Sequence, residues 1–320
     1  MPDDAADSAE KPRCFCLTAP TACGKTDLAL ELARRLPIEI VSVDSAMVYR
    51  GMDIGTAKPD AELRAAVPHH LIDVADPAEP YSAGRFLEDA RAAIDAIRGR
   101  GRMPLLVGGT LLYLRALRQG LASLPKADAR LRAELEEEAA RRGWPALHGR
   151  LTEIDPQAAR RIAPNDRQRI QRALEVYELT GRPLTALQSA GARQAGLSVE
   201  AIALVPPSRD VLAERIERRF DAMADAGFVT EVRQLRARGD LSMDTPSMRA
   251  VGYRQVWGYL AGGYDWPTAR AKAITATRQL AKRQMTWLRS EQGLEKLDAF
   301  APNLTEKLLK RIGSLPKVWS

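Results

Sequence analysis

The chain has 320 residues, of which 45% are hydrophobic, so it can bury the core of a large domain or of two domains. Lysine and arginine number 48 against 41 acidic residues, and this basic balance favours a polyanionic partner. Three cysteines without C-x-x-C spacing exclude a disulfide framework or zinc site, and no run reaches the length of a membrane span. We expect a cytoplasmic monomer with a disordered acidic leader over residues 1–12.

The first predicted strand, residues 14–17, leads into a loop with the composition of a phosphate-binding loop. Small residues let backbone N–H groups point at a phosphate, and the helix predicted by Leu28, Leu32 and Leu36 adds the positive end of its dipole. Lys25 can reach the outer phosphate, and the Thr26 hydroxyl can ligate Mg²⁺ held by the phosphates. The alternative is a plain strand-to-helix turn. The loop comprises Ala19, Pro20, Thr21, Ala22, Cys23, Gly24, Lys25 and Thr26.

Two later strands also end in polar residues. The β-rich run 38–43 ends at Asp44, and the run 103–107 leads into Gly108, Gly109 and Thr110. Because open α/β sheets build their sites at the carboxyl ends of the strands, both ends are expected beside the loop. With an amphipathic helix between the two runs, we predict an α/β fold with a P-loop NTPase-like parallel sheet.

The composition changes between residues 124 and 196, where charged helices such as 131–142 and 166–179 are separated by glycine and proline. No convincing strand occurs there, and residues 199–205 resume the sheet pattern. We therefore predict a helical insertion domain, 124–196, within a core of residues 13–123 and 197–320 whose C-terminal part is helical.

Basic residues concentrate on the predicted helix 266–290, which contains six and no acidic residue. At 100° per residue, Arg278, Lys282 and Arg289 lie within about 40° of one another, beside an apolar stripe that can dock the helix. A second basic group occurs in the insertion, at 160–161 and 167–172. Both groups predict contacts with RNA phosphates, although a basic helix face can also be simply solvated.

Six separated motifs together resemble the tRNA dimethylallyltransferases, also called tRNA isopentenyltransferases, of the bacterial type. The resemblance runs from about residue 13 to 291, and the shared order of the motifs is more specific than any one of them. Besides the loop, they are the string 44–59, His69 to Asp73, Gly108 to Thr110 with Tyr113, Asn165 to Glu175, Val251 to Gln255, and Lys282 to Arg289.

The resemblance implies transfer of a dimethylallyl group from dimethylallyl diphosphate to the N6 amine of an adenosine in tRNA. The target is the adenosine 3′ of the anticodon in tRNAs that read codons starting with U, and Mg²⁺ assists the departure of pyrophosphate. Asp44 would accept the amine proton, Thr110 would orient the amine, and Arg219 would bind pyrophosphate. The alternatives are a helix cap or magnesium ligand for Asp44, a turn cap for Thr110 and a surface arginine for Arg219.

The family's RNA-contacting positions map onto this chain with some departures. Ala19 replaces the first loop glycine, Met47 stands where glutamine or leucine is common, and Cys23 replaces serine. A thiol at a helix N-terminus can have a lowered pKa, so Cys23 predicts sensitivity to oxidation. The expected RNA contacts are Asp44, Ser45, Ala46, Met47, Thr110, Arg132, Gln168, Arg169, Ile170, Gln171, Arg172, Arg249, Ala250, Val251, Gly252, Tyr253, Arg254, Lys282, Arg283, Gln284, Met285, Thr286, Trp287, Leu288 and Arg289.

Three other functions fit parts of the sequence. An adenylate isopentenyltransferase shares the loop and the aspartate, but it would not use the insertion or the basic helix. A P-loop kinase would need an adenine-binding motif, and none is evident. A non-catalytic RNA-binding protein would not need Lys25, Thr26 and Asp44 together.

Overall fold

The computed structural model describes residues 14–190 and 196–313, so the leader predicted for residues 1–12 lies outside the described residues. The chain divides into two compact units, one made of the segments before residue 119 and after residue 196, the other of Gln119–Gly196. None of the described helices is long and apolar enough to cross a membrane.

The first unit is built on a parallel sheet of the strands β1 (Cys14–Thr18), β2 (Ile38–Val43), β3 (His69–His70), β4 (Met103–Gly108), β5 (Val199–Val205) and β6 (Glu295–Asp298). Their order is β3-β2-β4-β1-β5-β6, and each neighbouring pair is parallel. The central strands β1, β2 and β4 are buried along their whole length, as expected for a parallel sheet covered on both faces. The predicted α/β parallel sheet is therefore confirmed.

Three central strands end in register at the carboxyl edge of this sheet. Gly108 of β4 lies opposite Thr18 of β1 on one side and Val43 of β2 on the other. A Cβ atom at residue 108 would lie 2.0 Å from the Val43 carbonyl oxygen, so only glycine allows this approach. The residues that follow, Ala19, Asp44 and Gly109, consequently start three adjacent loops.

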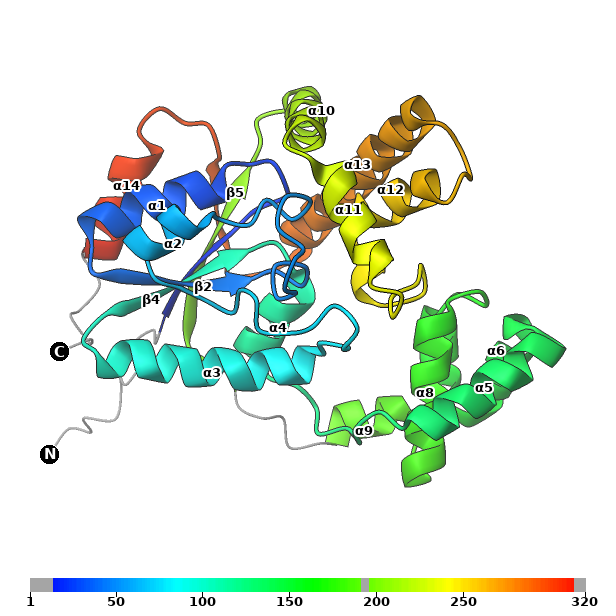
Figure 1. Ribbon diagram of the computed structural model, residues 1–320. Coiled ribbons are helices and arrows are strands. Elements are labelled where there is room, and N and C mark those ends of the chain that lie inside the picture. The colour runs from blue at the N-terminus through cyan, green and yellow to red at the C-terminus, as the bar shows by residue number, and fades with distance from the viewer. Residues whose placement is uncertain (1–13, 191–195, 314–320) are drawn as a thin grey trace, which may run out of the picture. The chain divides into compact units, whose positions relative to one another are not determined.

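Helices cover both faces of the sheet: α1 and α14 lie on one face and α3 on the other (Figure 1). Capping residues fix where several of them begin, including Ser82 before α3 and Asp265 before α13. The helices are α1 (Lys25–Arg35), α2 (Ala61–Ala66), α3 (Ala83–Gly99), α4 (Leu111–Gln119), α10 (Arg209–Asp225), α11 (Phe228–Ala237), the 3₁₀ turn η1 (Ser247–Arg249), α12 (Tyr253–Leu260), α13 (Trp266–Ser290) and α14 (Leu304–Gly313).

The second unit consists of helices in its described part: α5 (Ala129–Arg142), α6 (Trp144–Ile154), α7 (Pro156–Arg161), α8 (Arg167–Thr180) and α9 (Leu184–Ala190). Its own apolar core includes Leu147, Leu151 and Ile170. Asp155 caps α7 and accepts hydrogen bonds from the backbone and hydroxyl of Thr185. A core and polar network of its own are what an inserted folding unit requires.

Two edge strands do not follow from sequence patterns. β3 has only two residues, and Leu71 and Asp73 directly after it have positive φ angles. β6 has the sequence Glu-Lys-Leu-Asp, with only Leu297 buried. Neither shows the apolar run by which β1, β2 and β4 can be recognised.

Candidate active site

The loop between β1 and α1 has the tight backbone expected of a phosphate-binding loop. Ala22 and Gly24 both adopt positive φ, 65° and 75°, and Lys25 is the first residue of α1. A non-glycine residue in this conformation is uncommon and stores strain, which is typical of functional loops. The loop therefore presents a helix N-terminus and the Lys25 side chain at the carboxyl edge of the sheet.

Cationic side chains from two elements line a cleft of about 570 Å³ beside this loop. Lys25 and Thr26 come from α1, and Arg218 and Arg219 come from α10. Burial lowers the pKa of Lys25 and of Arg219, and the Asp44 carboxylate partly offsets this for both. Within the described part of the chain, Lys25, Arg218 and Arg219 form no ion pair with a carboxylate, so they can neutralise a bound anion.

Arg215 holds the loop from the same helix, a role that the sequence motifs do not reveal. Its Nε donates a hydrogen bond to the Ala22 carbonyl over 2.8 Å, and its guanidinium lies 4.6 Å from the centre of the Phe300 ring. The sequence signal that could have indicated this role is the spacing of Arg215, Arg218 and Arg219, which lie on one helix face. Arg215 thereby stabilises the positive φ at Ala22.

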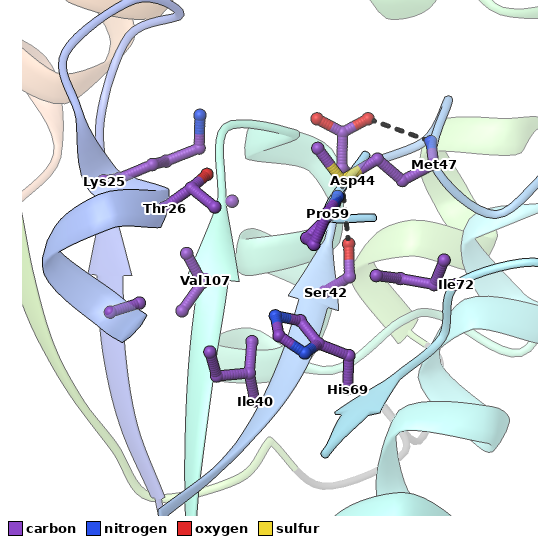
Figure 2. A pocket seen from close by; sticks show the side chains of 12 residues that line it. Lys25, Thr26, Ile40, Ser42, Asp44, Met47, Pro59, His69, Ile72 and Val107 are labelled. Atoms are coloured by element: carbon purple, nitrogen blue, oxygen red, sulfur yellow. Dashed lines mark hydrogen bonds between the residues drawn. The ribbon is translucent and has the colours of Figure 1, made fainter. Parts of the chain in front are cut away.

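Asp44 and Thr110 lie together, as the strand ends predict. The Asp44 Oδ1 accepts the N–H groups of Ala46 at 2.9 Å and Met47 at 3.4 Å, and Figure 2 shows the carboxylate above the end of β2. Thr110 Oγ1 accepts the Ser45 N–H at 2.9 Å and donates to the Ser45 hydroxyl. Within residues 14–190 and 196–313, Asp44 Oδ2 has no hydrogen-bond partner, so this oxygen can accept a proton.

Behind Asp44, a small and mainly apolar pocket extends between α1 and the strands β2 and β4 (Figure 2). Ile40, Met47, Ile72 and Val107 supply apolar walls. His69 also lines it; burial lowers the pKa of this imidazole, and its Nε2 has no hydrogen-bond partner among the described residues. The volume of the pocket is only about 20 Å³, which is room for about one water molecule, so the side chains around it would have to move apart before a short hydrocarbon could enter.

Residues 57–60 form another wall of the cleft, and the segment directly before them is held by a buried carboxylate. Glu231 of α11 accepts the backbone N–H groups of Asp53, Ile54 and Gly55, and also the Tyr253 hydroxyl. Arg219 donates to the carbonyl of Thr56 in the same segment. The position of this wall is thus determined by α11 and α12, far away in the sequence.

Cys23 differs from the prediction made from its place at a helix N-terminus. The side chain is 1% exposed, and burial raises the pKa of the thiol to about 11 although Lys25 and Arg215 act in the opposite direction. The thiolate form, which reacts with oxidants, is therefore scarce at neutral pH. The low-pKa hypothesis for Cys23 is wrong.

The predicted RNA contacts in the first unit divide into exposed and buried positions. Exposed residues are Arg249, Arg254, Lys282, Arg283, Thr286 and Arg289. Buried residues are Met47, Gly252, Tyr253, Gln284 and Leu288. Ser45 is exposed and Ala46, Ala250, Val251, Met285 and Trp287 are partly exposed. Direct RNA contact from the exposed group stays a prediction, and the buried side chains shape the surface from below.

The basic face of α13 is partly neutralised by another helix, although α13 itself contains no acidic residue. Arg270 pairs with Asp221 at 2.7 Å and with Glu217, and Arg278 pairs with Glu217 at 3.3 Å. The acids come from α10, so they are invisible in the sequence of α13. Lys282 and Arg289 form no ion pair with the described residues and remain the main cations of this face.

In the insertion, the predicted contacts surround a buried glutamate. Glu175 is fully buried and pairs with Arg132 at 2.8 Å and Arg172 at 2.6 Å. Gln171 donates to the Arg132 carbonyl, and Ile170 lies in the apolar core. Gln168 and Arg169 are exposed on α8 and are the members of this group best placed to contact a phosphate.

The residues present fit magnesium only if a phosphate ligand supplies oxygen atoms. No group of three or more metal-ligating side chains occurs in the described part of the chain. Mg²⁺ commonly takes one or two protein oxygens and completes its octahedron with phosphate oxygens and water. Thr26 lines the anion cleft, and its hydroxyl is the protein oxygen that would serve as such a ligand.

Comparison with known proteins agrees with this geometry. Residues 47–291 match the family described as IPP transferase. The tRNA dimethylallyltransferase of Paraburkholderia xenovorans (strain LB400) is 58% identical over 304 residues, covering 94% of this chain and 96% of the relative. That of Burkholderia mallei (strain SAVP1) is 60% identical, covering 91% of each chain.

Solved structures extend the likeness to the whole fold. The tRNA isopentenylpyrophosphate transferase of Bacillus halodurans is 39% identical with a TM-score of 0.69, covering 96% of this chain and 97% of that one. A eukaryotic dimethylallyltransferase acting on tRNA is 25% identical with a TM-score of 0.79, covering 95% and 80%. The resemblance recognised from the motifs is confirmed: this chain belongs to the IPP transferase family.

Proposed function

We propose that this protein transfers a dimethylallyl group from dimethylallyl diphosphate to the N6 amine of an adenosine in tRNA, as the names of its relatives indicate. The observation that carries the proposal is the meeting of three strand ends. They bring the phosphate loop, Asp44 and Thr110 to one edge, between a cationic cleft and an apolar pocket.

The cleft stabilises the leaving group. Breaking the bond between C1 and oxygen leaves pyrophosphate, whose charge the loop amides, Lys25 and Arg219 are placed to neutralise. Bound Mg²⁺ would add charge at the phosphate oxygens, with the Thr26 hydroxyl as its protein ligand. The apolar side chains beside Asp44 would contact the hydrocarbon once the pocket between them widens, and they would exclude water from the electrophilic carbon.

Asp44 and Thr110 prepare the acceptor. The adenine amine is a weak nucleophile because its lone pair is delocalised into the ring, so loss of its proton must accompany attack on C1. We assign proton acceptance to Asp44 Oδ2. Thr110, held against Ser45 by two hydrogen bonds, would orient the amine.

The target base must leave its stack to reach this edge. An anticodon loop lowers the cost because its bases are not in a duplex, so we propose the adenosine 3′ of the anticodon in tRNAs that read codons starting with U. Exposed basic residues on α13 and on the insertion domain would bind phosphates of the same tRNA. We place this reaction in the cytoplasm, where its tRNA substrate is found, and propose that the enzyme acts as a monomer.

The test is incubation with labelled dimethylallyl diphosphate and Mg²⁺, with tRNA, AMP or no acceptor. We expect label on tRNA alone, release of pyrophosphate, and loss of both when Lys25 is replaced by alanine. Labelled AMP without labelled tRNA would instead identify an adenylate isopentenyltransferase. ATP hydrolysis stimulated by tRNA, without prenyl transfer, would identify a kinase-like or ATPase activity.

A further inference from the structure

Gln284 is the one polar side chain on the buried face of α13. It is 6% exposed, whereas its neighbours Lys282 and Arg283 are exposed. The other buried residues of the helix are Ala269, Ala273, Ile274, Ala281 and Leu288. A buried primary amide is retained only where its donor and acceptor atoms find partners.

The two ends of this amide bind two different loops of the active site. Gln284 Oε1 accepts the Thr21 N–H of the phosphate loop at 3.0 Å. Gln284 Nε2 donates to the Gly109 carbonyl at 2.8 Å, one residue before Thr110. A single side chain therefore joins the loop that would hold the diphosphate to the turn that would hold the acceptor.

The backbone at these contacts is shaped for close approach. A Cβ atom on residue 109 would lie 2.7 Å from Gln284 Nε2 and 3.0 Å from the Ala19 carbonyl oxygen, so the contact requires glycine. The Thr21 N–H is occupied by Gln284, which shows that this loop amide serves internal geometry in the free protein. Both contacts are long-range in sequence, and neither can form unless α13 is docked.

We propose that Gln284 is a positioning residue that sets the distance and angle between the phosphate loop and the Thr110 turn. This inference rests on the proposed prenyl transfer, in which C1 of the donor and the amine of the acceptor must meet in a defined geometry. A misplacement of about 1 Å can lower a rate by about 10²-fold without abolishing binding. The role differs from direct RNA contact, because the side chain faces the two loops.

The first test is Gln284→Met, which keeps an unbranched side chain of similar length but removes both hydrogen bonds. We expect kcat to fall about 10- to 100-fold, with the KM for tRNA and for the diphosphate within about threefold. Gln279→Met is the matched control, since it makes the same change at an exposed position of the same helix and should leave kcat unchanged.

A second variant, Gln284→Glu, separates the two contacts and remains informative if the methionine variant does not fold. Its carboxyl group can still accept the Thr21 N–H, but it can donate to the Gly109 carbonyl only when protonated. We expect its kcat, relative to the unmodified protein, to rise as the pH is lowered. A folding defect caused by the buried carboxylate would also ease on protonation, so kcat is expressed per folded enzyme at each pH.

Two kinetic results would overturn the proposal. One is a kcat for Gln284→Met near that of the unmodified protein; the other is a raised KM for tRNA with kcat unchanged, which would identify an RNA contact. Amide hydrogen exchange at Thr21 provides a readout without activity, and faster exchange in Gln284→Met is expected. Absence of prenyl transfer by the unmodified protein would refute the proposed function, while unchanged exchange would refute the hydrogen bond itself.

Discussion

Replacement of Asp44 by asparagine tests the chemistry with little disturbance of the fold. Asparagine has a carbonyl Oδ1 that can still accept the Ala46 and Met47 N–H groups, so the turn after β2 should be kept. Its Nδ2 is a donor and cannot take the amine proton. Loss of a general base lowers turnover by about 10²- to 10⁴-fold, and we expect kcat to fall within this range.

The KM values distinguish a base from a magnesium ligand. Removing the Asp44 charge removes repulsion toward a diphosphate in the cleft, so the KM for dimethylallyl diphosphate should stay constant or fall. If Asp44 instead held magnesium, the KM for the diphosphate and the required Mg²⁺ concentration would both rise. Single-turnover measurements with labelled diphosphate and saturating tRNA report the chemical step directly.

Stability measurements test the capping alternative for Asp44, which in the structure is a cap of the turn after β2 and not of a helix. The free energy of unfolding, measured in urea, should change by less than about 0.5 kcal/mol for Asp44→Asn, because the two hydrogen bonds to Oδ1 can re-form. The free energy of unfolding of Asp44→Ala should be lower by about 1–3 kcal/mol, since it loses two hydrogen bonds that are worth about 0.5–1.5 kcal/mol each. Asparagine activity above about one tenth of the original, with a loss confined to the alanine variant, would refute the role of Asp44 as a base.

Two further predictions concern the surface and the loop. Replacing Lys282 and Arg289 with alanine should weaken binding to all tRNAs alike and flatten the slope of log K against log salt by about 0.7–0.9 per lost phosphate contact. The control Arg270→Ala removes a cation already paired with acids and should leave the slope unchanged. An unaltered slope in the double variant would identify a solvated face. Cys23 should resist iodoacetamide and peroxide at pH 8, because a pKa of about 11 leaves about one thiol in a thousand as thiolate. Rapid inactivation of the enzyme by these reagents, prevented by Cys23→Ser, would contradict this prediction.

The parts of the fold that follow from sequence are those specified by local patterns. The strands at 14–18, 38–43 and 103–108 read as apolar runs because both faces of a parallel sheet are covered. The helices follow from amphipathic spacing and caps such as Asp128 before α5. β3 and β6 do not follow, because two-residue and solvent-edged strands are stabilised by pairing with neighbours.

The candidate site, like the fold, is predictable from the sequence where local patterns specify it. Asp44, Thr110 and Lys25 come directly after strands or at a helix start, so chain order alone places them at the sheet edge. The pairing of Arg270 and Arg278 with α10 depends on helix packing, which a charge count along α13 cannot show. The raised pKa of Cys23 likewise depends on burial by distant segments.

Gln284 and Glu231 have structural roles that the sequence around them does not reveal. Each is a polar residue within a helix that looks suited to solvent or RNA, and each is buried and bound to backbone groups of an active-site loop. Backbone N–H and carbonyl groups of irregular loops need partners once they are covered, and a long polar side chain from a neighbouring helix can supply them. The loops that would hold the two substrates are thus stabilised by helices from the C-terminal half of the chain. Substitutions on these helices can therefore alter catalysis without contacting either substrate.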